Sequence, residues 1–390
     1  MNYTEVQPGK LPKTPPKGVV RLVHTADNHL RVSHSGSLER GQDFFNAAMS
    51  VVTIAGDHGA HAIINAGDML NSPENLPEVI NQLAQIDVAC QEIELPMYVV
   101  QGNHDFAEPS WITVQEQQPR LRPNAKGGTG LKLLNGVVRV GKLNILGLPF
   151  LTPDTLRKEL ELRSTQADEK KDTIHILVWH GSVLEFAKFP SENIITCEDL
   201  MKGPWSTVLL GDIHTRQYLK CDNTLIGYPG ATELCKRDEP LEHSCTVMDF
   251  DEKTGVCKGF EFVPVAHRPV MVLNIGDEQQ FVEATAQVME FAKKEPACMV
   301  LIRYVSTLSD VRMRIQQVAG SKAIVRAEAY PPTTMEAGRE DSDPSAAVKL
   351  PVDYLPVFPT TELSTLARQL CDPDVPVSDL LRNYAEGMTR

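Results

Sequence analysis

The sequence lacks the features that would place it in a membrane or in an oxidising compartment. No run of eighteen or more apolar residues occurs in the 390 residues, and the N-terminal segment, MNYTEVQPGKLPKTPPKG, has no apolar core of the kind a secretory signal needs. The eight cysteines are scattered and form no C-x-x-C pair, which argues against a disulfide framework or a cysteine-rich zinc site. We therefore expect a soluble, cytoplasmic protein with reduced thiols and no membrane association.

Positive charge is also scarce. The chain has 38 lysines and arginines against 51 aspartates and glutamates, a formal net charge of −13. A sequence-independent nucleic-acid binder is usually basic over its contact face, so this balance argues against attraction of the whole molecule to DNA. It does not exclude a nuclease, because bound metal cations bring positive charge to the phosphate and an acidic body can carry a local basic groove.

What the sequence does contain is a regular alternation of strands and helices. The apolar runs and helical spacings between residues 19 and 100 follow the order of βαβ units, and strand-like runs with fewer helices between them continue to Val265. This predicts an α/β (α+β layered) catalytic domain over residues 19–265. Residues 1–18 are rich in proline and lysine and are expected to form an extended arm rather than a packed element.

A second pattern begins at Pro269. Strand and helix signals alternate up to Ala329, which predicts a small, separate βαβαβ domain over residues 266–331. Residues 332–355 are rich in Pro, Asp, Ser and Glu without a hydrophobic period and read as a linker. Residues 356–390 are expected to form two short helices, whose apolar faces pack either on their own protein or on a partner.

Five short segments place Asp, His or Asn directly after an apolar strand. They are Asp27-Asn28-His29, Gly67-Asp68, Gly102-Asn103-His104-Asp105, His180-Gly181 and Gly211-Asp212-Ile213-His214. Ligands of α/β sheets bind beyond the carboxyl ends of the strands, so these loops are expected to converge on one site. Mixed carboxylate, imidazole and amide ligands favour a pair of divalent ions, Mn²⁺ or alternatively Mg²⁺, with Asp68 as the natural bridge.

These motifs resemble those of the calcineurin-like metallophosphoesterase superfamily, whose order is D-x-H, G-D, G-N-H-[DE], G-H and G-H-x-H. The resemblance covers roughly residues 19–265 and implies a β-sandwich flanked by helices. It implies that the first metal is bound by Asp27, His29 and His214, the second by Asn103, His180 and Asp212, with Asp68 between the two. It also implies that His104 assists the leaving oxygen. Asp105 or Asn71 is expected to orient His104, with an ordinary turn carboxylate as the alternative for Asp105.

The chain departs from this pattern at one position. Asp212 stands where the family most often has the first histidine of G-H-x-H. A carboxylate oxygen can bind the same ion, but it is expected to shift the second site toward Mn²⁺ or Mg²⁺.

The segment Tyr228-Pro229-Gly230 and the order of the following elements resemble DNA double-strand-break repair nucleases of the SbcD type. This resemblance implies a DNA exonuclease or endonuclease of recombination, repair or replication, with residues 266–331 as a capping, DNA-steering domain. It also implies that residues 356–390 bind an SbcC-like coiled-coil ATPase. The helix at 78–92 and the stretch after Pro109 would form a homodimer interface, with plain domain packing as the alternative.

Basic residues near the motifs are candidate contacts for the DNA backbone; these are Arg31, Arg216, Lys236 and Arg237. The alternative for each is a solvated surface charge. Two other functions stay open at this stage. One is a small-molecule or cyclic-nucleotide phosphodiesterase, and the other is a degenerate, non-catalytic DNA-binding subunit that has lost its second metal through Asp212.

Overall fold

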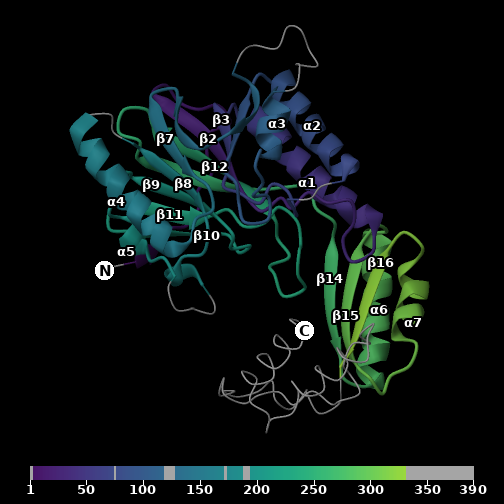
Figure 1. The fold of residues 1–390 in the computed structure, drawn as a ribbon. Coiled ribbons are helices and arrows are strands. Elements are labelled where there is room, and N and C mark those ends of the chain that lie inside the picture. Colours follow the sequence, from purple (N-terminus) through teal and green to yellow (C-terminus); the bar gives the residue numbers. More distant parts are fainter. Residues whose placement is uncertain (1–2, 74–75, 118–127, 171–173, 188–193, 331–390) are drawn as a thin grey trace, which may run out of the picture.

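Two large sheets packed face to face form the body of the protein, and a smaller three-stranded sheet lies beside them (Figure 1). The computed structural model describes residues 3–73, 76–117, 128–170, 174–187 and 194–330. Helices cover the outer faces of both large sheets. The layered α/β architecture that the sequence predicts is confirmed, including the small α/β unit near the C-terminal end of the described residues.

The first large sheet has six strands in the order β13-β12-β2-β3-β4-β5. Its strands are β2 (Val19–Thr25), β3 (Ala62–Asn65), β4 (Pro96–Val99), β5 (Gly130–Leu133), β12 (Ser244–Asp251) and β13 (Cys257–Pro264). Its outer face is covered by α1 (Leu38–Asp57), α2 (Pro77–Glu92) and α3 (Trp111–Gln117). Strands β2 to β5 run parallel, so their carboxyl ends meet at one edge of the sheet.

The second large sheet has seven strands in the order β1-β10-β11-β9-β8-β7-β6. Its strands are β1 (Tyr3–Glu5), β6 (Gly136–Val140), β7 (Leu143–Leu148), β8 (Ile176–His180), β9 (Thr207–Gly211), β10 (Gln217–Cys221) and β11 (Thr224–Tyr228). Helices α4 (Pro153–Lys170) and α5 (Cys197–Leu200), with a 3₁₀ turn at Leu184–Phe186, lie on its outer side. Strands β7, β8 and β9 are parallel.

Strands β2 and β3 are buried on both faces, and apolar residues follow each other along them. In β2, Leu22 faces the core between the two sheets, and the next residue, Val23, faces the core under the helices. In β3 the same division separates Ile64 from Ile63. Such continuous apolar runs are typical of strands that are covered on both sides.

The N-terminal arm is extended, as predicted, but the expectation that it is not packed is wrong. Residues Tyr3–Glu5 form an edge strand that pairs antiparallel with β10. Beyond this strand, the N–H of Val6 donates to the carbonyl of Tyr218 at 3.0 Å, and that of Gly9 to the carbonyl of Phe260 at 2.8 Å. Backbone hydrogen bonds make these contacts, so the polar, proline-rich sequence carries no periodic signal for them.

The small unit consists of three parallel strands and two helices. These are β14 (Val270–Ile275), α6 (Glu278–Lys294), β15 (Met299–Val305), α7 (Val311–Ala319) and β16 (Ile324–Tyr330). The helices cover one face of the sheet, and the other face turns toward the larger body, where Leu234 packs against Met299 and Leu301 (Figure 1). The predicted linker at 332–355 and the predicted tail at 356–390 lie outside the described residues.

Ion pairs connect the small unit to helix α1 of the larger body. The guanidinium of Arg268, just before β14, binds both carboxylate oxygens of Asp43 at 2.6 and 2.9 Å. Arg40, on the same helix, contacts Asp43 at 2.9 Å and Glu233 at 3.2 Å. Arg40 and Glu233 are fully buried, so their charges depend on each other for compensation.

Within the described part of the chain, no helix combines the length and the apolar character that crossing a membrane requires.

The buried pair between Arg21 and Asp249 gives a testable prediction of stability. Two hydrogen bonds, 2.6 and 2.8 Å long, join the side chains across β2 and β12. Replacing Asp249 with alanine leaves an unpaired charge in the core, so Asp249→Ala is expected to lower the free energy of unfolding by about 3–5 kcal/mol in urea denaturation. Glu252→Ala, which breaks the exposed pair with Lys142, serves as the control and is expected to cost less than about 1 kcal/mol. Equal losses for both variants would contradict this account.

Candidate metal centre

The five motif loops meet in one place, between the carboxyl ends of strands from both large sheets. The loops after β2, β3 and β4 come from the first sheet, and the end of β8 and the loop after β9 come from the second. Backbone hydrogen bonds join loops within each sheet: Asp27 N–H donates to the Gly67 carbonyl at 3.0 Å, and Gly181 N–H to the Gly211 carbonyl at 3.0 Å. Across the sheets, the N–H of Asp212 donates to the Asp27 carboxylate.

Four of the seven predicted metal ligands have a left-handed backbone conformation. The φ angles are 52° for Asp27, 47° for His29, 53° for Asp68 and 108° for Asp212. A non-glycine residue in this region costs about 1–3 kcal/mol and persists where the surroundings enforce it. In the first loop, these bends allow Asp27 and His29 to face the site while Asn28 between them bonds to Asn65 and Thr232.

Glycines allow the loops to approach one another closely. A Cβ atom at Gly102 would collide with the carboxylate of Asp68, and one at Gly67 would collide with the imidazole of His180. The motifs G-D and G-N-H-D therefore need their glycines because a ligand of another loop occupies the space of the missing side chain.

The carboxylate of Asp68 lies at the centre of the site. Its Oδ1 is 3.4 Å from Nε2 of His180 and accepts the N–H of His104 at 3.0 Å. Its Oδ2 is 3.8 Å from Nε2 of His29. Asp68 thus belongs to two groups of ligand atoms, one with Asp27 and His180 and the other with His29 and His104. This is the position that a carboxylate bridging two ions would need.

The first metal position is defined by two imidazoles that face each other. Nε2 of His29 and Nε2 of His214 are 3.2 Å apart, and Oδ1 of Asp27 is 3.8 Å from the latter. Burial lowers the pKa of His29 to about 2 and raises the pKa of Asp27 to about 6. The Nδ1 of His214 donates to Oε1 of Glu239 at 2.7 Å, which leaves its Nε2 directed at the site.

The second metal position surrounds Nε2 of His180. The Nδ1–H of this residue donates to the carbonyl of Ala66 at 2.8 Å, since a carbonyl can only accept, and Nε2 is left to face the site. Oδ1 of Asn103 lies 3.0 Å from this Nε2, and Oδ1 of Asp212 lies 3.9 Å away. The other oxygen of Asp212 accepts a hydrogen bond from the hydroxyl of Ser182.

The acidic groups favour positive charge at both positions. Burial disfavours the charged form of His180, but the hydrogen bond and the charge of Asp68 outweigh it and raise the pKa of His180 to about 10. Burial also opposes charge on His214, whereas Cys235 and Glu239 raise its pKa to about 11. A metal cation that displaces these protons would compensate the same negative charge, so the donor set fits a pair of divalent ions.

His104 and Asp105 have different environments. His104 is exposed, and its Nδ1–H donates to the carbonyl of Asn71 at 3.0 Å. Asp105 is buried, and its carboxylate accepts the N–H groups of Gly102 at 2.6 Å and Met69 at 2.8 Å. Among the described hydrogen bonds, the backbone of Asn71 contacts the imidazole of His104. Asp105 instead connects the loop after β4 to the loop after β3.

Two residues that contact predicted ligands were missed by the sequence analysis. Glu239 orients His214 from 25 residues further along the chain, and Ser182 contacts Asp212 from 30 residues before it. Ser182 directly follows the His180-Gly181 motif, which is a weak local signal. No sequence pattern marks Glu239, because the loop after Gly230 has to fold back toward His214 before the two side chains meet.

The four predicted DNA contacts occupy different environments. Arg31 donates to the carbonyl of His29 at 2.8 Å and stacks over the ring of Phe44, 4.3 Å from its centroid. Arg216 forms a salt bridge with Glu242. Arg237 donates to the carbonyl of Leu273 at 2.7 Å, on the small unit.

Lys236 is exposed and lines a cavity of about 410 Å³ together with Asp212, His214 and Glu239. The cavity therefore opens directly beside the metal positions.

Comparisons with known proteins agree with this geometry. A family model described as calcineurin-like phosphoesterase matches residues 20–216, about half of the chain. The DNA double-strand break repair protein Mre11 of Haloferax volcanii is 26% identical over 297 residues, 73% of this chain and 62% of the relative. Mre11 of Methanosarcina mazei is 24% identical over 294 residues, 73% of this chain and 45% of the relative. A subunit of the nuclease SbcCD of Staphylococcus saprophyticus is 22% identical over 335 residues, 77% of this chain and 82% of the relative.

The chain spans less than two thirds of the length of each of the two Mre11 relatives.

The hydrogen bond from His214 to Glu239 predicts a change in metal affinity. Glu239→Gln weakens the acceptor that holds His214 in place, so we expect the affinity for Mn²⁺, measured by isothermal titration calorimetry, to fall about 10–100-fold. Glu242→Gln is the matched control, because Glu242 lies in the same loop with an 80% exposed side chain and pairs with Arg216. Unchanged Mn²⁺ affinity in Glu239→Gln would show that this contact does not support the metal centre.

Proposed function

The chain belongs to the calcineurin-like phosphoesterase family, and from this membership we propose that it is a two-metal-dependent nuclease that hydrolyses phosphodiester bonds in DNA. The observation that carries the proposal is the convergence of five strand-end loops around Asp68, which belongs to two groups of potential metal ligands. The names of the relatives, DNA double-strand break repair protein and nuclease subunit, support DNA as the substrate and repair or recombination as the process.

The proposed ligand assignment follows the two faces of the site. Asp27, His29 and His214 would hold the first ion, Asn103, His180 and Asp212 would hold the second, and Asp68 lies between the two groups and could serve both. When bound, two divalent ions, Mn²⁺ or Mg²⁺, neutralise the phosphate and activate the attacking water. In three histidines, His104, His180 and His214, Nδ1 donates a hydrogen bond to an oxygen of the protein. The Nε2 of each ring points away from that oxygen and can contact an ion or a phosphate.

His104 is the proposed acid for the leaving oxygen. Its backbone N–H is held by Asp68 and its Nδ1–H by the Asn71 carbonyl, so the ring has a fixed orientation next to the metal positions. The residue is exposed, so its Nε2 would be accessible to a phosphate of the substrate. Asp105 contributes by holding the loop that carries this histidine.

Contact with DNA is proposed to be local because the protein as a whole is acidic. Lys236 lines the cavity beside the metal positions and is the most direct candidate for a phosphate contact. The small unit, whose sheet turns one face toward the larger body, would steer the DNA (Figure 1).

Two partners are part of the proposal. Residues 356–390, which lie outside the described part, would bind an SbcC-like coiled-coil ATPase. A homodimer would form through α2 and the stretch after Pro109. Helix α2 buries Val79, Leu83 and Ile86 in the core of its own chain. A second copy of the protein would therefore contact the opposite side of the helix.

Cleavage of DNA by a His104 variant tests the catalytic assignment. Purified protein with Mn²⁺ is expected to digest end-labelled linear double-stranded DNA and to hydrolyse bis-p-nitrophenyl phosphate, and a chelator is expected to stop both reactions. His104→Ala removes the proposed acid but no metal ligand, so cleavage should fall about 10²–10⁴-fold with Mn²⁺ and DNA binding largely intact.

The control is His61→Ala, since His61 is also exposed but precedes β3, at the opposite end of the strand from the site. Cleavage by His104→Ala at the wild-type rate would refute the assigned role. Hydrolysis of the small diester without DNA cutting, even with the ATPase partner added, would favour a small-molecule phosphodiesterase. Inactivity on both substrates would favour a degenerate binding subunit.

The aspartate at position 212 predicts the metal preference of the second site. Asp212→His replaces a carboxylate oxygen by imidazole, which borderline ions prefer, so we expect the ratio of Zn²⁺ affinity to Mg²⁺ affinity to rise at least about tenfold. Competition titrations with a chromophoric chelator measure both ions. Asp238→His, in the same cavity but outside the ligand set, is the control. If the ratio of Zn²⁺ to Mg²⁺ affinity changes equally in both variants, Asp212 is not a metal ligand.

A further inference from the structure

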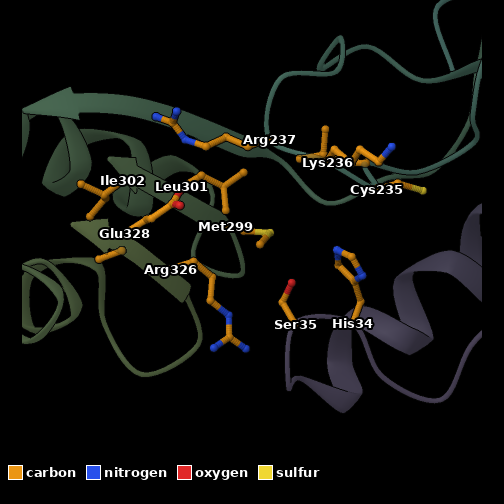
Figure 2. Close-up of a pocket in the computed structure, with 12 residues that line it drawn as sticks. His34, Ser35, Cys235, Lys236, Arg237, Met299, Leu301, Ile302, Arg326 and Glu328 are labelled. Carbon is orange, nitrogen blue, oxygen red and sulfur yellow. The ribbon is translucent and has the colours of Figure 1, made fainter. Parts of the chain in front are cut away.

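The loop after Gly230 brings a cysteine to the first metal position. The Sγ of Cys235 forms a group with one ring nitrogen each of His29 and His214, and these three atoms all lie within 4.8 Å of one another. Figure 2 shows this sulfur turned away from Met299 and Leu301 of the small unit. The other six free cysteines among the described residues belong to no such group.

We propose that Cys235 is a thiolate ligand of the ion held by His29 and His214. The first site then prefers a soft or borderline ion such as Zn²⁺, whereas the second site, with Asn103 and Asp212, prefers Mn²⁺ or Mg²⁺. The proposal rests on the two-metal function proposed above and adds to it a further ligand and a difference in metal preference between the two sites.

The spacing of the three atoms is compatible with a single ion. With Zn–N bonds near 2.0–2.1 Å and Zn–S bonds near 2.3 Å, the ligand atoms of a tetrahedral zinc ion lie about 3.5 Å apart. The Nε2 atoms of His29 and His214 are already 3.2 Å apart. A cysteine side chain has one rotatable bond, so its sulfur can change position without movement of the loop.

One carboxylate positions both His214 and Cys235. Oε1 of Glu239 accepts the Nδ1–H of His214 at 2.7 Å, and its Oε2 accepts the backbone N–H of Cys235 at 2.8 Å. Metal ligands are commonly held by such outer hydrogen bonds, which fix their direction toward the ion. Glu239 therefore holds the imidazole of His214 and the backbone of Cys235 next to each other.

Arg31 links Cys235 to the loop of the D-x-H motif. The Nη2 of Arg31 lies 3.9 Å from Sγ of Cys235, and its Nε donates to the backbone carbonyl of His29 at 2.8 Å. The cysteine and the first predicted ligand loop are therefore held by the same side chain.

Cobalt substitution tests the proposal without DNA. Co²⁺ is titrated into the metal-free, full-length protein, and a thiolate bound to Co²⁺ produces a charge-transfer band in the near ultraviolet. We expect this band in the wild type and its loss in Cys235→Ser, which keeps the weaker visible bands of histidine-bound Co²⁺. Cys257→Ser is the matched control and should keep the band: Cys257 is also partly exposed, and its thiol contacts the Gly259 carbonyl as that of Cys235 contacts the Glu233 carbonyl, but it belongs to no group of potential ligands among the described residues.

Metal affinities provide the second measurement. In Cys235→Ser the dissociation constant for Zn²⁺ should rise at least about tenfold, while that for Mn²⁺ should change less than about threefold, because Mn²⁺ gains little from a thiolate. A wild type without the band at saturating Co²⁺, or a Cys235→Ser variant that keeps it, would overturn the proposal. Neither result depends on DNA cleavage, so failure of this ligand and failure of the nuclease function are separate outcomes.

Discussion

The architecture of the site depends on the contacts made by one buried carboxylate, that of Asp68. It holds the backbone of His104 and lies within 4 Å of ring nitrogens from His29 and His180, which come from different sheets. Gly102 has to lack a side chain for this carboxylate to occupy its position. In a buried, acidic environment such an arrangement is stable when cations compensate the charge, which is why the geometry points to metal ions.

The sandwich is what brings these groups together. Strands β2 and β3 of one sheet and β8 and β9 of the other are buried on both faces, and β4 is buried on one. The strands determine where the loops begin, and the short motifs determine how they bend, as the positive φ angles of Asp27 and Asp68 show. The energetic cost of these bends is offset by the packing of the strands that precede them. The site is therefore built at the ends of buried strands.

Much of this could be predicted from the sequence, because buried strands and strand-end motifs are local patterns. The alternation of strands and helices predicted for residues 19–100 and for the segment from Pro269 to Ala329 is present in the structure. The strand Tyr3–Glu5 escaped prediction since it is short, polar and held by backbone hydrogen bonds. Glu239 and Cys235 escaped as well, because their contacts with the metal ligands arise from loop folding and leave no periodic or spacing signal. Side chains that position a ligand are thus harder to recognise than the ligand itself.

The most direct test of the central claim is the electron paramagnetic resonance spectrum of the protein loaded with Mn²⁺. If Asp68 bridges two ions, the wild type binds two Mn²⁺ per chain and shows an exchange-coupled spectrum. Asp68→Asn is then expected to lose the coupling, whereas Asp238→Asn, on the cavity rim, retains it. A wild type that binds a single ion, or two ions without magnetic coupling, would contradict a bridged two-metal centre.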